Sequence, residues 1–243
     1  MSIVKQGIEL IESKDFEELS RISAEVMVEC IRKKPDSLFC LATGSSPARA
    51  YEIFVEIVNK EQINVRKLRI LKLDEWWRIN ENDPCTCESF IQTKIIIPLK
   101  IPSQNYIGFN SNTPDANVEC NRIAQTLQEQ GPIDLCILGI GKNGHLGLNE
   151  PGGYFIPFSH VVKLDEKTKT HEMLTKTNVT INYGMTIGVA DIIASRKVLF
   201  LAAGDEKKAS FNIFLKRQVR SDLPASILWL HPNALCVFES KLI

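Results

Sequence analysis

The segment with the strongest chemical signature spans residues 139–151 and reads Gly-Ile-Gly-Lys-Asn-Gly-His-Leu-Gly-Leu-Asn-Glu-Pro. A glycine-rich turn leads into His145, and Glu150 follows close behind. Histidine exchanges protons near neutral pH, and a neighbouring carboxylate sets its charge and orientation. We therefore interpret His145 and Glu150 as an acid/base pair, with a structural histidine as the alternative. The remaining histidines, which lack such a glycine-rich setting, are His160, His171 and His231.

A second candidate is a pair of adjacent carboxylates. Asp74 and Glu75 come directly after an apolar segment at 68–73 and directly before two tryptophans. A carboxylate that apolar neighbours partly desolvate holds its proton more tightly and works as a base near neutral pH. The segment is therefore interpreted either as a catalytic base, Asp74, or as a helix cap followed by two core aromatic residues.

A third candidate has the composition of an anion-binding loop, Thr43-Gly44-Ser45-Ser46-Pro47. Gly44 permits close backbone approach, three hydroxyl groups surround it, and Pro47 suits the first turn of a helix. The free N–H groups and the dipole at a helix N-terminus favour a phosphate. We predict that the first four of these residues bind a phosphate; an ordinary turn with a serine cap is the alternative.

Neither glycine-rich segment matches a nucleotide-binding pattern. The loop at Gly44 lacks the G-x-x-x-x-G-K-[ST] signature. Gly139, Gly141 and Gly144 have the spacing of a dinucleotide fingerprint, but no long helix follows and no acidic residue ends a strand about 20 residues later. We therefore expect no nucleotide cofactor.

Short apolar runs that alternate with amphipathic stretches must position these residues. The runs are typical of strands buried on both faces and span Ser37–Thr43, Leu68–Asp74, Ile133–Gly139, Lys197–Ala203 and Ala234–Glu239. The stretches with helical spacing span Asp15–Lys33, Pro47–Lys60, Cys87–Pro98, Asp115–Gln130 and Asp205–Gln218. This alternation indicates an α/β fold with a doubly wound, mostly parallel sheet. No linker or repeat divides the sequence, so we predict a single domain over residues 1–243 with a candidate lid at 152–182.

The candidate segments follow four of the five predicted strands. The fourth of these strands leads into Gly204-Asp205-Glu206-Lys207-Lys208, which contributes cations. In open parallel sheets, ligands bind outside the carboxyl ends of the strands. The four segments are therefore expected to meet at one site.

The composition excludes several classes of protein. The 243 residues carry 29 basic and 29 acidic side chains, a balance that argues against a nucleic-acid-binding protein. No apolar run is long enough for a membrane span or a signal peptide, so we expect a cytoplasmic protein. The seven cysteines lie mostly in apolar stretches without paired ligand spacing, which predicts reduced structural thiols and no metal.

Together these segments resemble the glucosamine-6-phosphate deaminase/isomerase family, and are most similar to its galactosamine-6-phosphate isomerase/deaminase branch. The resemblance runs in order along nearly the whole sequence, through residues 43–47, 73–76, 139–151, 185–188 and 204–207. The branch is indicated by residues 142–149, 171–174 and 224–231. This resemblance implies a Rossmann-like sugar-phosphate isomerase fold. It also implies conversion of a 2-amino-2-deoxyhexose 6-phosphate into a ketohexose 6-phosphate and ammonia.

The resemblance further implies a role for each candidate residue. His145, tuned by Glu150, opens the sugar ring, and Asp74 moves a proton from C2 to C1. Residues 43–46 and Lys207 bind the phosphate. No metal or organic cofactor is required. The expected partner is a small amino-sugar phosphate, with no nucleic acid and no membrane. Assembly into a homo-oligomer is left as an alternative to a monomer.

The sequence departs from the glucosamine branch at three places. Asn143, a candidate catalytic residue, stands where that branch has an aspartate, and an amide orients His145 without stabilising an imidazolium by charge. Either Glu150 takes over that role, or the substrate and pH optimum differ. The phosphate-binding arginine of that branch has no counterpart near residues 171–176. Its basic allosteric segment is missing from residues 152–162, which argues against activation by an acetylated sugar phosphate.

Two other functions remain alternatives. A 6-phosphogluconolactonase-type hydrolase is related in fold, but those enzymes resemble Gly-x-Asp-Gly-His followed by Ser-Leu-Phe-Pro, whereas this sequence has Asn149-Glu150-Pro151. A non-catalytic sugar-phosphate sensor dispenses with Asp74 or His145, and both are present. We therefore predict an aldose–ketose isomerase with deamination. It acts on galactosamine 6-phosphate or glucosamine 6-phosphate, and faster on the galactosamine sugar.

Overall fold

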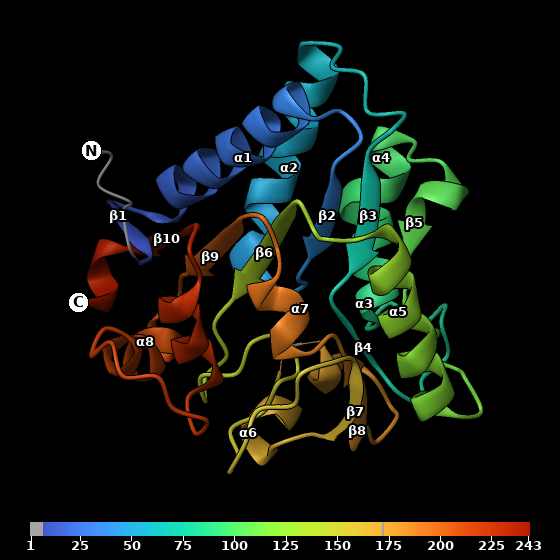
Figure 1. The fold of residues 1–243 in the computed structure, drawn as a ribbon, viewed down its shortest axis with the longest axis vertical. Coiled ribbons are helices and arrows are strands. Elements are labelled where there is room, and N and C mark those ends of the chain that lie inside the picture. The colour runs from blue at the N-terminus through green and yellow to red at the C-terminus, as the bar shows by residue number, and fades with distance from the viewer. Residues whose placement is uncertain (1–6, 172) are drawn as a thin grey trace.

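In the part of the chain that the structure describes, seven strands form the central sheet, whose place in the fold is seen in Figure 1. The computed structural model describes residues 7–171 and 173–243. The strands are β1 (Glu9–Ser13), β2 (Leu38–Leu41), β3 (Arg69–Lys72), β5 (Tyr106–Ile107), β6 (Leu135–Gly139), β9 (Val198–Ala202) and β10 (Ala234–Glu239). They lie in the order β1-β10-β9-β6-β2-β3-β5, and all neighbours run parallel. This topology confirms the predicted doubly wound, mostly parallel sheet.

The five predicted strands are all present, and the sequence missed the two strands at the edges of the sheet. β1 has two exposed and two partly buried side chains, and only Ser13 is fully buried. β5 contains two residues, both half-buried. A strand that is paired on one side and partly exposed lacks the continuous apolar run by which a central parallel strand is recognised.

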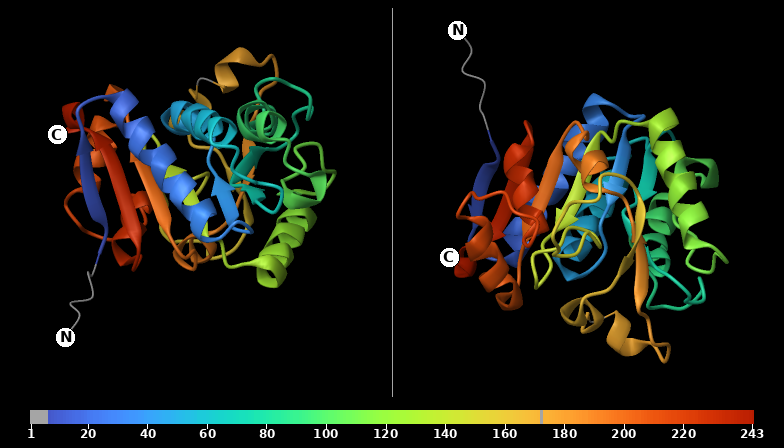
Figure 2. Two further views of the ribbon diagram at one scale, coloured as in Figure 1. Left: turned by 90° about the horizontal axis from the view of Figure 1, so that it is seen from above. Right: turned by 60° about the horizontal axis from the view of Figure 1, so that its bottom comes forward.

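Helices cover both faces of this sheet, as Figure 2 shows from two further directions. On one face lie α1 (Phe16–Lys33) and α2 (Ser45–Lys60). On the other lie α5 (Ala116–Gln130), α7 (Val189–Ile193) and α8 (Lys208–Phe214). Within the part of the chain that the structure describes, no helix has the length and apolar character to cross a membrane.

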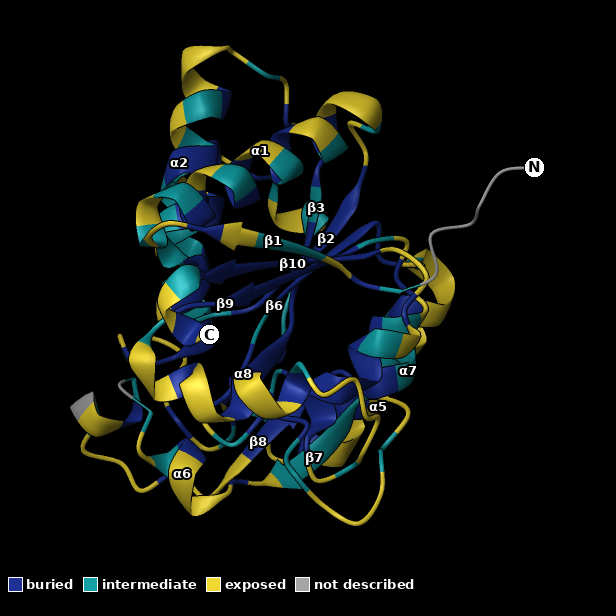
Figure 3. Ribbon diagram, turned by 90° about the vertical axis from the view of Figure 1, so that its left-hand side faces the viewer, coloured by how far each residue is buried: buried dark blue, intermediate teal, exposed yellow. Residues whose placement is uncertain are grey.

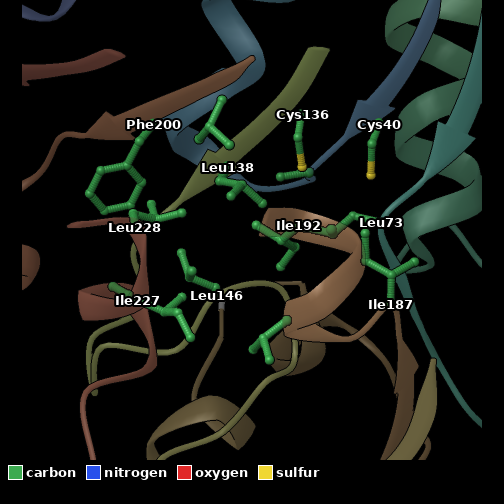
Figure 4. Close-up of a cluster of buried hydrophobic side chains, with 14 of the residues drawn as sticks. Cys40, Leu73, Cys136, Leu138, Leu146, Ile187, Ile192, Phe200, Ile227 and Leu228 are labelled. Carbon is green, nitrogen blue, oxygen red and sulfur yellow. The ribbon is translucent and has the colours of Figure 1, made fainter. Parts of the chain in front are cut away.

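The core is divided by the sheet into two halves, and β2 explains why central strands are apolar throughout. Leu38 and Cys40 belong to the core on one face, and Phe39 and Leu41 to the core on the other. Cys40 pairs in register with Cys136 of β6, and both thiols point to the same face (Figure 4). The central strands are buried and the outer surfaces of the helices are exposed (Figure 3).

Three predicted helices match the structure and two are corrected. The predicted helix over 87–98 is interrupted: α3 (Cys87–Ile91) continues through a wider π-helical turn at 92–96 into α4 (Ile97–Leu99). The predicted helix over 205–218 is shorter, because a 3₁₀ turn at 205–207 precedes α8 and the chain leaves the helix after Phe214. Arg217 then adopts a left-handed φ of 58° that no helix accommodates.

A second, smaller sheet lies beside the carboxyl ends of the main strands. β4 (Asp74–Trp76) begins one residue after β3 and pairs antiparallel with β8 (Tyr183–Thr186), which pairs antiparallel with β7 (His160–Lys163). The predicted irregular stretch 152–182 therefore contains β7 and a short helix, α6 (Glu166–Lys169). β7 is built into the small sheet, so only the remainder of this stretch is irregular.

Candidate active site

Eight of the nine predicted site residues line one pocket at the carboxyl ends of β2, β3, β6 and β9. The eight are Thr43, Gly44, Ser45, Ser46, Asp74, Asn143, His145 and Lys207. They come from four loops that are far apart in the sequence and meet at one edge of the sheet. The ninth residue, Glu150, lies behind His145 and contacts its ring.

The loop after β2 has the geometry of an anion site. Gly44 has a φ of 103°, which favours glycine, and α2 begins at Ser45 without a side-chain cap. The first N–H groups of a 16-residue helix and its dipole therefore face the loop. Lys207 lines the same pocket and is only 9% exposed; burial lowers the pKa of its ammonium, Glu206 opposes this, and Lys142 adds to it. A negatively charged group bound in the pocket would stabilise the charged ammonium of Lys207.

Asp74 is the buried carboxyl group of the pocket, with 7% of its surface exposed. Burial raises its pKa to about 7, and the neighbouring Glu75 adds to the rise. His145, the Cys87 thiol and Lys72 act in the opposite direction. A carboxyl group that titrates near neutral pH both takes up and returns a proton, which is what a base that moves a proton between two carbons requires.

His145 is held from behind by three polar side chains. Its Nδ1 lies 3.4 Å from Glu150 Oε2 and 3.1 Å from Thr168 Oγ1. Asn143 Nδ2 donates to the same Glu150 oxygen at 2.8 Å, and Asn143 Oδ1 accepts the backbone N–H of His145 at 3.2 Å. Burial raises the pKa of Glu150, but His145, Thr168 and Asn143 outweigh it and hold that pKa below its ordinary value. Asn143 therefore links the Glu150 carboxylate to the backbone of His145, and the lowered pKa of Glu150 favours its charged form.

The glycine turn that precedes His145 is shaped by the imidazole ring. A Cβ atom at Gly141 would lie 2.3 Å from Cδ2 and 2.4 Å from Nε2 of His145, so the ring packs directly on the Gly141 backbone. The turn therefore needs glycine at this position so that the ring can approach the backbone closely. With Nδ1 fixed by its partners, Nε2 is the nitrogen left to exchange a proton.

Sequence reasoning missed three pocket residues that lie on or after α6. Lys167, Thr168 and His171 line the pocket from within the candidate lid. His171 had no glycine-rich neighbours in sequence, yet its Nε2 lies 3.5 Å from the point where a Cβ on Gly44 would stand. Its ring lies 6.1 Å from that of Trp76, between centroids. The sequence signal was the segment 171–174, which belongs to the resemblance described above.

A buried ionic cluster on the other side of β4 was also missed. The Lys72 ammonium is fully buried and lies 2.8 Å from Glu75 Oε2, 2.7 Å from Glu88 Oε2 and 2.9 Å from the Phe109 carbonyl. Burial lowers the pKa of Lys72, but Glu75 and Glu88 outweigh it and hold that pKa above its ordinary value. The lysine stood out in sequence as one charge within an apolar run.

No group of three or more histidine, cysteine, aspartate or glutamate side chains in residues 7–171 and 173–243 is arranged to hold a metal ion. The pocket instead combines a buried carboxyl group, an anchored imidazole and an anion loop with lysines at its rim. This set of groups suits proton transfer on a small anionic molecule.

Comparisons with known proteins agree with this chemistry. The model of the family "Glucosamine-6-phosphate isomerases/6-phosphogluconolactonase" matches residues 14–237. AgaI of Escherichia coli (strain K12), provisionally named a deaminase, is 39% identical over 227 residues, which are 93% of this chain and 90% of AgaI. A solved monomeric glucosamine-6-phosphate deaminase of the NagB superfamily has a TM-score of 0.91 at 28% identity, covering 97% of this chain and 98% of that one. A 6-phosphogluconolactonase from Thermotoga maritima has a TM-score of 0.76 at 20% identity, covering 97% and 100%, and so shares the fold.

Proposed function

Because the chain belongs to the family of glucosamine-6-phosphate isomerases and 6-phosphogluconolactonases, we propose that it is an amino-sugar-6-phosphate isomerase/deaminase. The reaction converts a 2-amino-2-deoxyhexose 6-phosphate and water into a ketohexose 6-phosphate and ammonia. One observation carries this proposal: Asp74, with a pKa of about 7, shares a pocket with His145, whose Nδ1 is anchored by Glu150. A base and an acid/base imidazole are the two groups that the reaction needs.

Ring opening is assigned to His145. Its Nε2 moves a proton from the C1 hydroxyl to the ring oxygen, the bond between C1 and that oxygen breaks, and the open-chain aldehyde forms. The imidazolium that forms in passing is stabilised by Glu150, whose lowered pKa keeps its carboxylate charged. This assignment resolves the Asn143 departure, since the charge comes from Glu150 and the orientation from the amide.

Isomerisation and loss of ammonia follow at C1 and C2. The Asp74 carboxylate takes the proton from C2, the electron pair forms a C1–C2 double bond, and the C1 oxygen takes a proton from the solvent. Asp74 then returns its proton to C1, which leaves an iminium group at C2. Water adds to that carbon, ammonia departs, the proton taken up earlier at the C1 oxygen is balanced by one released to the solvent, and the C2 ketone remains.

The phosphate is assigned to the loop after β2 and to Lys207. The N-terminus of α2 supplies N–H groups, Ser45 and Ser46 supply hydroxyls, and Lys207 supplies the charge. The distance between this loop and Asp74 is then spanned by the sugar chain, with C6 at the loop and C2 at the carboxylate.

Galactosamine 6-phosphate is proposed as the preferred sugar. The support is the resemblance of residues 142–149, 171–174 and 224–231 to the galactosamine branch. The first two of these segments contribute His145 and His171 to the pocket wall.

The test is a coupled ammonia assay with galactosamine 6-phosphate and glucosamine 6-phosphate, run beside an assay of 6-phosphogluconolactone hydrolysis. We expect ammonia from both sugars, faster from the galactosamine sugar, and none above background from Asp74→Asn. Lactone hydrolysis without ammonia would replace the proposal with the lactonase alternative. Sugar-phosphate binding without either reaction would indicate a sensor.

A further inference from the structure

A chain of two hydrogen bonds runs from Thr43 through Cys87 to Asp74. The Thr43 hydroxyl donates to Cys87 Sγ at 3.3 Å, and the Cys87 thiol donates to Asp74 Oδ1 at 3.7 Å. We propose that Cys87 and Thr43 are positioning residues, which hold one carboxylate oxygen of Asp74 and leave the other for the substrate. The inference rests on the proposed role of Asp74 as the base.

The Cys87 thiol is suited to donate because it keeps its proton. Its residue is 1% exposed, and burial, together with Glu75 and Asp74, raises the pKa of Cys87 well above its ordinary value. A protonated thiol has one hydrogen to donate and a sulfur that accepts weakly. The Thr43 hydroxyl fills the accepting side, so the hydrogen of Cys87 is directed to the carboxylate.

The position of Cys87 is fixed by Glu75, the residue next to Asp74. Glu75 accepts the backbone N–H groups of Trp76 at 2.8 Å, Cys87 at 3.0 Å and Glu88 at 2.8 Å. These bonds hold the first turn of α3 against β4, and this fixes the Cys87 thiol relative to the Asp74 carboxylate. The Lys72 ammonium, 2.8 Å from Glu75, balances the charge of the Glu75 carboxylate in this contact.

The arrangement changes the role expected for Thr43. A hydroxyl group has a single hydrogen to donate, and the hydrogen of Thr43 is used by Cys87. A phosphate accepts hydrogen bonds and offers none when fully ionised. The phosphate is therefore left to the rest of the loop, and Thr43 serves the base.

The groups that face Asp74 set the sign of the expected effect. Glu75 on the same strand raises the pKa of Asp74 in addition to burial, whereas His145, Cys87 and Lys72 lower it. Removing the thiol takes away a donor that favours the charged carboxylate. The pKa of Asp74 should then rise, so that, as the pH is lowered, Asp74 becomes protonated and stops acting as a base at a higher pH than in the wild type.

The pH profile of kcat/KM tests this in Cys87→Ala and Cys87→Ser, with Cys120→Ala as a buried cysteine control on α5. Cys87→Ala should move the acidic limb upward by about half a pH unit, which is a loss of about threefold below the limb and little change above it. Cys87→Ser, which keeps a donor, should move it less, and Cys120→Ala should leave it in place. An unmoved limb in a folded Cys87→Ala protein would overturn the proposal.

Thr43→Val separates the two roles open to Thr43. A positioning role predicts a small upward movement of the acidic limb and a KM that stays within about twofold, because a threonine that binds no phosphate contributes little to substrate affinity. A KM at least tenfold higher with an unmoved limb would return Thr43 to the phosphate site and overturn its part in the chain.

An infrared measurement tests the chain without any substrate. The S–H stretching band of Cys87, isolated as the difference between wild type and Cys87→Ala, should shift as Asp74 titrates and should lose that pH dependence in Asp74→Asn. A band that ignores Asp74 would overturn the proposal even in an active enzyme. A band that follows Asp74 in a protein that releases no ammonia would uphold the chain and contradict the proposed function alone.

Discussion

Two clusters of buried charge share strand β4, and they differ in how completely their charges are paired. Asp74 and Glu75 are adjacent, so their side chains point to opposite faces of the strand. Glu75 accepts three backbone N–H groups and the Lys72 ammonium. Asp74 accepts a long hydrogen bond from a thiol, at 3.7 Å. One carboxylate is saturated with donors and the other is left short of them.

The difference in pairing separates structure from chemistry. A buried carboxylate that is fully hydrogen-bonded ties elements together, as Glu75 ties α3 to β4. A buried carboxylate with weak partners takes a raised pKa and so becomes a base near neutral pH, as Asp74 does. The saturated cluster is also what places the unsaturated carboxylate, because both belong to one three-residue strand.

The strongest test of this division is Asp74→Asn. The amide keeps the shape of the side chain and removes the base, so ammonia release should fall by about 10³-fold while the protein stays folded. Steady-state assays with both sugars measure the loss, and Asp36→Asn, on an exposed turn, is the matched control. A variant that kept a tenth of the activity or more would show that Asp74 is not the base.

The converse test is made at the saturated cluster with Lys72→Met. Removing the ammonium leaves the buried Glu75 and the half-buried Glu88 without their shared cation, so the free energy of unfolding should fall by about 3 kcal/mol. Urea denaturation measures it, and Lys67→Met, at an exposed position in the turn before β3, should change stability by less than about 0.5 kcal/mol. Equal stability of the two variants would contradict a structural role for the cluster.

The features that the sequence predicted are those recorded in local patterns of residues. The loop at Thr43–Ser46 and the turn before His145 were placed correctly at the ends of strands, because each is a local pattern at the end of an apolar run. The main sheet was predicted because its central strands are buried on both faces and are therefore apolar throughout. In each case the signal lies within about ten consecutive residues.

The missed features depend on contacts between distant segments. The small sheet was missed because β4 finds its partner about 110 residues later, at β8, and no local pattern records that pairing. Lys72 reads as an anomaly in an apolar strand until Glu88 and the Phe109 carbonyl are placed around it. His171 reaches Gly44 only because the chain after α6 folds back over the pocket.

Asp74 should also make the stability of the protein depend on pH, and Asp74→Asn shows this apart from activity. In the folded protein the pKa of Asp74 is about 7 against an ordinary value of 3.8, so its stabilising contribution is fully present below pH 3.8 and is lost as the pH rises to about 7. Asparagine does not ionise. The variant should match wild type near pH 4 and exceed its free energy of unfolding by about 2 kcal/mol at pH 8, about half of what the full shift gives, since water reaches the pocket. Parallel stability curves across this range would remove the difference on which the comparison rests.

The smallest expected effect concerns Glu150, a carboxylate between the two extremes. It contacts His145 and accepts from Asn143, and its pKa is held below its ordinary value, so it is better paired than Asp74 yet serves the site from behind. Glu150→Gln keeps an oxygen that accepts from Asn143 and removes the charge that stabilises the imidazolium, so kcat should fall by about tenfold with KM nearly unchanged. Glu166→Gln, exposed on α6, is the control and should retain wild-type kcat. A rise in KM at constant kcat would mean that Glu150 binds the substrate and does not support His145. The hydrogen bonding of a carboxylate would then fail to distinguish one that supports a catalytic residue from one that binds substrate.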